Sequence, residues 1–295
     1  MGQANEKASE AESAVPAEFR MISGCQDDQT SADVSNVGEF ELPDPAGRAG
    51  GACTSALLKT LYDDHKTPED TLSFVEVLKA MRTYLDGEGF SQIPQLTSSK
   101  AVEVNEPFDL VPPEATGTRR ALLIGINYVG MNGELSGCHN DVLNIKEYIK
   151  DVHGFEEENI VVLMDDDEHD PPTKKNILDG YARLVEESEE GDAVFCHYSG
   201  HGGRLRDLNG DEADGYDETL IPVDYLSAGQ IRDDAIFDTL VRPMKGGVTV
   251  TCLMDCCHSG TVLDLPYHFR ADSEGDSMEV DEGFNFNKLF GKIFR

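Results

Sequence analysis

Hydrophobic runs and helical stripes alternate along the second half of the chain. Short, nearly continuous runs of apolar and β-branched residues predict four buried strands, at 119–127, 159–165, 192–200 and 248–255. Between these runs, apolar residues recur at helical spacing near 142–152, 177–185 and 236–241. Buried strands that alternate with helices indicate an α/β fold with a central, mostly parallel sheet flanked by helices on both faces.

The first half of the chain predicts a smaller unit. The apolar run at 18–24 predicts a strand, and helical spacing over 49–64 and 71–86 predicts two helices. The segment 91–98 predicts a short edge strand, because Pro94 has no N–H group to donate to a neighbouring strand.

Polar and proline-containing segments set the expected boundaries. The first residues are small, polar and rich in glutamate, which is typical of disorder. Three prolines and the lack of a helical period are typical of a linker after the smaller unit. We therefore expect a disordered N-terminus at 1–17, a smaller region at 18–99, a linker at 100–117, a larger region at 118–270 and a C-terminal tail at 271–295.

The chain is strongly acidic, with 57 acidic and 24 basic residues among 295 and a formal net charge of −33. Such a surface repels nucleic acid and anionic membranes, so we expect neither as a partner, whereas metal ions and basic peptides suit it. No apolar run reaches the roughly 18 residues of a membrane span, and the first residues lack the apolar segment of a secretory signal. Seven cysteines without such a signal indicate free thiols, and we expect a cytoplasmic protein.

Reactive side chains follow the last two strands of the larger region. The third strand ends in HYSGHGG and the fourth in DCCHSG, and the carboxyl ends of parallel strands meet at one edge of a sheet. We expect His201 to face Cys257 there, because a thiol and an imidazole form a nucleophile–base pair. Gly202 leaves its backbone N–H group free to approach a developing oxyanion. The histidine precedes the cysteine by 56 positions, 201 to 257, close to the roughly 50 of caspase-type proteases.

Two metal sites that these segments superficially offer do not fit. Cys256, Cys257 and His258 are not expected to bind zinc, because adjacent cysteines lack the usual C-x₂₋₄-C spacing. The acidic segment 207–218 is not expected to be an EF-hand, because Glu212 stands at its sixth position, where the loop requires glycine.

The two motifs resemble the signature motifs of the metacaspases, which are caspase-related cysteine proteases of the caspase–hemoglobinase fold, and the resemblance extends over 119–268. It implies that His201 and Cys257 form the catalytic dyad. It also implies a pocket for Arg or Lys at the P1 position of the substrate, lined by Asp255, Asp141, Cys138 and Ser199. A buried carboxylate pairs strongly with a guanidinium or ammonium group, whereas an acidic P1 side chain would be repelled.

The smaller region also resembles metacaspases. ISGCQDDQTSAD, GACTSALL and FSQIPQLTSS are similar to the small-subunit region, which in most members follows the large-subunit region. Here it comes first, an order that resembles the type III metacaspases of algae. Such a rearrangement is tolerated when the termini of a domain lie close together at its surface. We expect one continuous sheet, with 18–23 and 91–98 added at one edge.

The resemblance further implies a calcium site. Many metacaspases require Ca²⁺, and the matching positions are Asp217, Asp233, Asp234 and Asp264. Four carboxylates and water suit a hard cation that takes six to eight oxygen ligands. The ion is expected to activate the enzyme without taking part in the reaction. The alternative is a solvated acidic face, which is natural in a chain this negative.

Cys196 lies in the third strand of the larger region. Neighbouring strands are about 4.8 Å apart, which is within reach of a disulfide. We hypothesise that Cys196 forms a disulfide with Cys257 or Cys256 under oxidation and thereby silences the enzyme. The alternative is that Cys196 is a buried structural residue.

Together these features predict a calcium-dependent cysteine endopeptidase that cleaves basic peptide or protein substrates after Arg or Lys. The resemblance to metacaspases also implies a monomer, and the high charge of one sign agrees with that expectation. Two alternatives stay open: an inactive homologue that acts as a calcium-binding scaffold, and a cysteine transferase or peptidase of another clan on a similar sheet.

Overall fold

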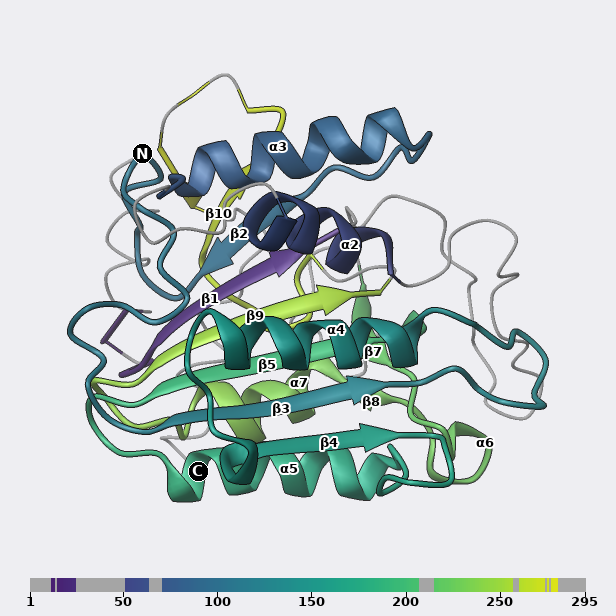
Figure 1. Ribbon diagram of the computed structural model, residues 1–295. Helices are drawn as coiled ribbons and strands as arrows, with labels where there is room; N and C mark the ends of the chain where they lie inside the picture. Colours follow the sequence, from purple (N-terminus) through teal and green to yellow (C-terminus); the bar gives the residue numbers. More distant parts are fainter. Residues whose placement is uncertain are drawn as a thin grey trace.

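The structure, a computed structural model, describes residues 12–13, 15–24, 51–63, 71–206, 215–256, 260–273, 275 and 277–280 (Figure 1). Its strands are β1 (Glu18–Ser23), β2 (Gln95–Ser98), β3 (Arg119–Gly125), β4 (Ile160–Met164), β5 (Ala193–Ser199), β6 (Gly202–Arg206), β7 (Tyr216–Leu220), β8 (Ile231–Arg232), β9 (Thr249–Asp255), β10 (Tyr267–Arg270) and β11 (Glu279–Val280). Its helices are α2 (Ala52–Leu58), α3 (Phe74–Gly87), α4 (Cys138–Asp151), α5 (Lys174–Glu187), α6 (Tyr225–Ala228) and α7 (Asp233–Ile236), with π-helical turns η3 (Lys59–Asp63) and η5 (Phe237–Val241) and a 3₁₀ turn η4 (Glu157–Asn159).

Eight strands form one sheet in the order β11-β10-β2-β1-β9-β5-β3-β4. Strands β1, β9, β5, β3 and β4 are parallel, and β2, β10 and β11 pair antiparallel beyond them. Because β1 pairs with β9, with Glu18 opposite Thr249, both halves of the chain build the same sheet.

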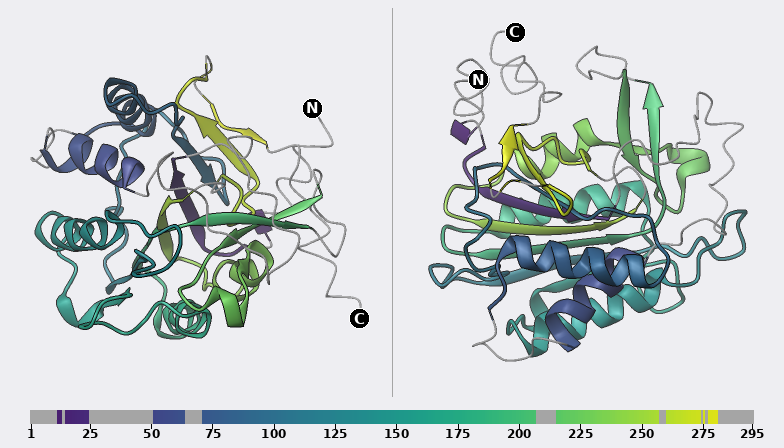
Figure 2. Two further views of the ribbon diagram at one scale, coloured as in Figure 1. Left: turned by 90° about the vertical axis from the view of Figure 1, so that its right-hand side faces the viewer. Right: turned by 90° about the horizontal axis from the view of Figure 1, so that it is seen from above.

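Helices cover both faces of this sheet (Figures 1 and 2). On one face lie α2, α3 and α4, where Leu123 of β3 shares a core with Val142 of α4. On the other lie α5, α7 and η5, where Leu122 shares a core with Ile177 of α5. Neighbouring residues of a strand point to opposite faces, so a core on each face explains the continuous apolar strands. The predicted α/β architecture is confirmed.

Local sequence signals explain how two of the helices begin. Ser73 caps α3: its hydroxyl accepts from the Glu76 N–H, and the Glu76 carboxylate accepts from the Ser73 N–H at 2.8 Å. At the start of α4 the controlling residue is Gly125 in β3, where a Cβ would lie 2.7 Å from the Cys138 carbonyl oxygen. Only glycine allows this approach, which brings the first turn of α4 to the carboxyl edge of the sheet.

A second, three-stranded antiparallel sheet, β6-β7-β8, starts directly after β5. The hydrophobic pattern does not predict it, because β7 is a short and mostly polar segment, YDETL. It positions several candidate residues, since His201 lies between β5 and β6 and Asp217 lies on β7.

The position of β2 differs from the prediction. It is not an edge strand, because β10 pairs along its outer side, with Phe269 opposite Leu96. Pro94 stands just before β2, and its carbonyl oxygen accepts a hydrogen bond from the Ala271 N–H at 3.0 Å. Pro94 is thus the last residue before β2. Its missing N–H group does not prevent β2 from pairing on both sides.

The segments predicted as disordered or linking also contribute to the cores. Val15 is buried, so packing begins within the segment 1–17. The segment 100–117 contains no helix or strand, yet Val104 and Leu110 are buried. Most of the predicted N-terminal segment and the tail after residue 280 lie outside the described residues. Within the part of the chain that is described, each helix is too short or too polar to cross a bilayer.

Candidate active site

The two predicted reactive segments meet at the carboxyl edge of the sheet. Ser199 at the end of β5 lies opposite Asp255 at the end of β9. His201 follows two residues after β5, and the N–H of Gly200 lies 3.4 Å from the carbonyl oxygen of Asp255. The predicted nucleophile Cys257 lies outside the described residues, in the segment 257–259.

The imidazole of His201 is held in one orientation. Its Nε2 atom lies 2.8 Å from the carbonyl oxygen of Gly133, and because a carbonyl only accepts, Nε2 carries the hydrogen. In the neutral ring Nδ1 is then the unprotonated nitrogen. Burial lowers the pKa of His201 from its ordinary value, and the bond to Gly133 partly opposes that shift. A neutral ring with a free Nδ1 is suited to accept a proton.

The pairing of β6 with β7 sets the direction of the Gly202 N–H group. The Ile221 N–H donates to the His201 carbonyl at 3.2 Å, and Gly202 lies opposite Leu220 in the β6–β7 pair. Hydrogen-bonded and non-hydrogen-bonded pairs alternate along an antiparallel ladder, so the N–H group of Gly202 points away from β7. That direction leaves it able to approach a substrate atom.

Two buried carboxylates form the centre of the predicted P1 pocket. Asp141, in the first turn of α4, accepts a 2.7 Å hydrogen bond from the Ser199 hydroxyl. Asp255 accepts hydrogen bonds from the backbone N–H groups of Gly51 at 3.0 Å and Thr54 at 2.7 Å. Both aspartates are less than a tenth exposed. The structure therefore brings together these predicted pocket residues.

The smaller region completes this pocket through the start of α2. Gly51, the residue before α2, has φ of 106°, and a Cβ there would lie 3.2 Å from Asp141 Oδ2. A side chain at Gly51 would be strained in conformation and would also crowd that carboxylate. Helix N-terminal N–H groups stabilise negative charge, so α2 favours the ionised form of Asp255.

The two carboxylates do not ionise alike. Burial raises the pKa of Asp141 to about 7, the charge of Asp255 adds to the shift, and the Ser199 hydrogen bond opposes it. Burial also raises the pKa of Asp255, but there the backbone N–H groups of α2 oppose the shift. These N–H groups thus favour the ionised form of Asp255, whereas Asp141 takes up a proton near neutral pH. Burial also raises the pKa of Cys138 to about 12, so its thiol is neutral in the pocket.

Three of the four predicted calcium ligands form a cluster. Carboxylate oxygens of Asp217 on β7 and of Asp233 and Asp234 on α7 lie within 4.8 Å of one another. Asp264 is not part of this group of three; it lies in a turn with φ of 49°. A set of carboxylate oxygens alone fits a hard cation such as Ca²⁺, so the residues are compatible with the implied ion.

Positively charged and backbone groups also contact the cluster. The guanidinium of Arg232 pairs with Asp217 and donates to the Arg206 carbonyl at 3.1 Å. The Glu218 N–H donates to Asp233 Oδ2 at 3.1 Å. Arg232 therefore ties β8 to both strands of the β6–β7 hairpin.

Of the two predicted disulfide partners of Cys196, Cys257 lies outside the described residues, so that bond stays a prediction, and Cys196 itself has another neighbour. It lies opposite Cys252 in the β5–β9 pair, and a hydrogen bond between the two thiols is the first cause of the raised pKa of Cys252, followed by burial. From Cys252 to Asp255 the strand runs roughly 10 Å, and Cys256 lies beyond that point. The predicted bond from Cys196 to Cys256 is therefore wrong, because strand register separates the two residues.

Sequence reasoning missed several residues that surround the site. Tyr128 and Tyr198 contact the backbone of His201, and Gly133 contacts its ring. Thr54 lies 3.1 Å from the buried imidazole of His197. His197 and Tyr198 belong to the motif HYSGHGG, so the motif could have identified them. Tyr128 lies in a loop after β3, and the hydrophobic pattern does not predict that a loop residue is buried.

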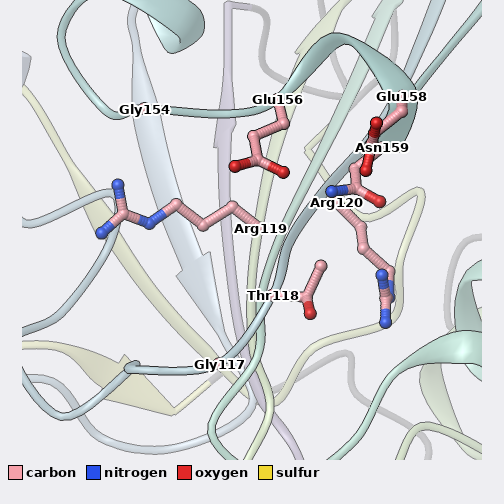
Figure 3. Close-up of a pocket in the computed structure, with 8 residues that line it drawn as sticks. All are labelled: Gly117, Thr118, Arg119, Arg120, Gly154, Glu156, Glu158 and Asn159. Atoms are coloured by element: carbon pink, nitrogen blue, oxygen red, sulfur yellow. The ribbon is translucent and has the colours of Figure 1, made fainter.

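A separate polar cavity of about 500 Å³ opens at the other end of β3 (Figure 3). Figure 3 shows the side chains of Arg119 and Arg120 pointing to opposite sides of it. Each guanidinium donates to a backbone carbonyl, of His153 and Glu187 respectively. Because it adjoins the amino end of β3, this cavity is remote from His201 and does not belong to the candidate active site.

Comparisons with known proteins agree with this geometry. The model for the metacaspase peptidase C14 domain matches residues 119–266, and the model for the caspase domain matches residues 2–104. Metacaspase III c of Phaeodactylum tricornutum is 64% identical over 282 residues, covering 95% of this chain and 84% of that protein. Metacaspase-1 of Eremothecium gossypii is 54% identical over 53% of this chain and 35% of its own length. Metacaspase-1A of Neurospora crassa is 46% identical over 60% of this chain and 39% of its own length.

The two matched regions also follow one another along the chain in the predicted order, with the smaller region first. The caspase-domain match precedes the metacaspase match along the chain, so the rearranged order is confirmed. The chain spans less than half the length of the two fungal relatives but most of the relative from Phaeodactylum tricornutum. On these matches, the chain belongs to the metacaspases, a family of caspase-like cysteine peptidases.

Proposed function

We propose that the protein is a calcium-dependent cysteine endopeptidase that cleaves basic peptide or protein substrates after Arg or Lys. One observation carries the proposal: the buried carboxylates Asp141 and Asp255 lie at the same sheet edge as His201. A cationic P1 side chain is the chemical complement of such a pair, and guanidinium and ammonium groups both form strong bonds with carboxylates.

The proposed reaction uses Cys257 as nucleophile and His201 as base. Nδ1 of His201 takes the thiol proton, and the thiolate sulfur attacks the carbonyl carbon of the scissile bond. The imidazolium then gives the proton to the leaving amine, so that the amide bond breaks and a thioester remains on Cys257. A water molecule that loses its proton to the same nitrogen hydrolyses the thioester and releases the free thiol.

Backbone N–H groups are the proposed oxyanion donors. Gly202 directs its N–H away from β7, and the N–H of Cys257 is the second candidate. Such donors stabilise the negative oxygen of the tetrahedral intermediate more than the neutral carbonyl of the substrate. Loss of one donor in comparable sites slows turnover by about 10²–10³-fold.

Calcium is proposed to bind Asp217, Asp233 and Asp234. Asp264, in the turn after β9, is a further proposed ligand. When bound, the ion would neutralise the mutual repulsion of these carboxylates. The position of the ligand Asp217 on β7 supports an activating role for the ion. Strand β7 pairs with β6, and β6 begins next to His201. The ion has no step in bond cleavage, which the dyad performs.

Redox control through Cys196 is proposed to involve Cys252. Directly opposite residues of neighbouring strands lie about 4.8 Å apart, within the Cα range of a disulfide. A peroxide would oxidise the two thiols by two electrons and be reduced to water and an alcohol or a second water. Cys196 and Cys252 each lie three residues before a pocket residue, Ser199 and Asp255, so a disulfide there would alter the packing beneath the pocket.

The test is hydrolysis of fluorogenic peptides with Arg at P1 by purified protein, with Ca²⁺ or with EGTA, beside the Cys257→Ala variant. Calcium-stimulated cleavage that the variant lacks would support reaction, nucleophile and metal together. Equal rates with and without the ion would remove the calcium requirement. Absence of cleavage under reducing conditions would favour a calcium-binding scaffold instead.

A further inference from the structure

Two tyrosines are fully buried beside His201, and the proposed reaction uses neither of them. Tyr198 lies near the end of β5, and Tyr128 lies in the loop that follows β3. Their hydroxyl oxygens are 3.4 Å apart. Phenol hydroxyl groups in a core normally serve a specific hydrogen bond, since burying them without one is unfavourable.

The hydroxyl groups bind the backbone at the entrance to β6. Tyr128 Oη accepts from the His201 N–H at 3.0 Å and donates to the Ile221 carbonyl at 2.7 Å. Tyr198 Oη donates to the His201 carbonyl at 2.8 Å and accepts from the Ile221 N–H at 3.2 Å. The N–H and the carbonyl group of His201 thus each form a hydrogen bond with a tyrosine hydroxyl.

The loop that carries Tyr128 also holds the side chain of His201. The phenol ring of Tyr128 packs against the imidazole with a centroid distance of 4.8 Å and a tilt of 41°. Five residues later, the carbonyl of Gly133 accepts from Nε2. One loop therefore fixes the histidine at its backbone N–H, its ring face and its Nε2 atom, so that Nδ1 is the nitrogen without a hydrogen in the neutral ring.

Two backbone features show that the surroundings enforce this arrangement. Tyr128 has φ of 54°, a left-handed conformation that is strained for a bulky residue. Such strain persists only where packing and hydrogen bonds hold it in place. At Gly200 a Cβ would lie 3.0 Å from Tyr198 Oη and 3.3 Å from Tyr128 Oη. The glycine of HYSGHGG that precedes His201 therefore makes room for the two hydroxyls.

We propose that Tyr128 and Tyr198 are positioning residues for His201, which they hold through hydrogen bonds from their hydroxyl groups to its backbone. The inference rests on the proposed function, in which His201 is the base. A displacement of about 1 Å in a catalytic group can slow a reaction by about 10²-fold. The two tyrosines would thus act on turnover without touching the substrate.

The test compares Tyr128→Phe, Tyr198→Phe and Gly200→Ala with Tyr181→Phe, a control in a buried tyrosine of α5. The phenylalanine variants keep the rings and remove only the hydroxyl groups. We expect kcat to fall about 10–100-fold in the first three variants while KM changes less than about twofold. Tyr181→Phe should keep the parent kcat. A parent-like kcat in Tyr128→Phe and Tyr198→Phe would overturn the inference.

A second readout does not depend on peptidase activity. ¹⁵N NMR of the histidine rings in the Cys257→Ala background reports the tautomer and the pKa of His201. Without the Tyr128 hydroxyl, we expect the ring to loosen from its buried position and its lowered pKa to return toward the ordinary value. An unchanged tautomer and titration in both phenylalanine variants would contradict positioning. If the parent cleaves no peptide while the titration shifts as expected, the protease proposal fails and the positioning role stands.

Discussion

The backbone N–H of Thr54 donates a 2.7 Å hydrogen bond to the carboxylate of Asp255, across 201 positions of the sequence. Thr54 lies in the first turn of α2, in the smaller region, whereas Asp255 ends β9 in the larger one. The proposed P1 pocket is therefore completed by both regions. Its geometry depends on where β1 and α2 dock and not on which region comes first in the chain.

The first prediction concerns the pH dependence of cleavage. Below about pH 7 Asp141 carries a proton, so the pocket has less negative charge to pair with a cationic P1 side chain. The value of kcat/KM for Arg at P1 should rise about three- to tenfold as pH increases from 6 to 8. Citrulline at P1 has the shape of arginine without its charge and is the matched control. If both substrates show the same rise, Asp141 does not control recognition.

The second prediction concerns the stability of the Asp141→Asn variant. The folded state keeps the Asp141 proton up to about pH 7, whereas the unfolded chain loses it near 3.8, so the free energy of unfolding of the parent falls as pH rises between these values. Asparagine removes that penalty. The variant should be more stable than the parent by about 1–3 kcal/mol at pH 8, with little difference near pH 4, and should cleave Arg substrates poorly.

Thermal or urea unfolding at several pH values measures this difference. Asp179→Asn, in an exposed carboxylate of α5, is the control and should follow the parent. A destabilised Asp141→Asn protein at pH 8 would show that the Ser199 hydrogen bond and the charge are worth more than the cost of burial.

The third prediction concerns oxidation. After treatment with hydrogen peroxide, peptide mapping without reductant should find the peptides of Cys196 and Cys252 joined by a disulfide. Cys196→Ala and Cys252→Ala should each lose the part of the inactivation that dithiothreitol reverses, whereas Cys25→Ala should respond as the parent does. If Cys196→Ala loses and regains activity just as the parent does, redox control does not pass through this pair.

The fourth prediction concerns calcium affinity. The guanidinium of Arg232 competes with a cation for Asp217, which is almost fully buried. Arg232→Gln should therefore bind Ca²⁺ about three- to tenfold more tightly in calorimetry on the Cys257→Ala background. Arg204→Gln, which loses a 3.1 Å ion pair with Glu218 on the same hairpin, is the control. Weaker binding by Arg232→Gln would mean that the arginine supports the site.

The architecture of the larger region follows from its pattern. Strands with a core on each face are continuously apolar, so β3, β4, β5 and β9 were visible in the sequence. The β6–β8 sheet was not, because polar residues such as Glu218 are buried there through ion pairs and not through apolar packing. Pro94 suggests an edge position for β2, but the strand begins only at Gln95, so the proline does not restrict its pairing with β10.

The sequence predicts those residues of the candidate site that belong to the motifs HYSGHGG and DCCHSG. His201, Asp255 and Ser199 stand at strand ends, where topology alone brings them together. The partner of Cys196 depends on strand register, which the sequence does not specify to the residue. Tyr128 lies in a loop, and its contact with His201 arises from a left-handed backbone conformation that no periodicity signals.

Covalent labelling tests the central claim most directly. A peptide reagent with Arg at P1 and an electrophile that captures thiolates would be incubated with calcium-loaded protein, and the modified peptide would be identified by mass spectrometry. The account predicts one adduct, on Cys257, which His201→Ala and Asp255→Asn both slow strongly and which an Asp-P1 reagent does not form. Labelling of another cysteine, or equal labelling by the Asp-P1 reagent, would contradict the proposed nucleophile or the proposed pocket.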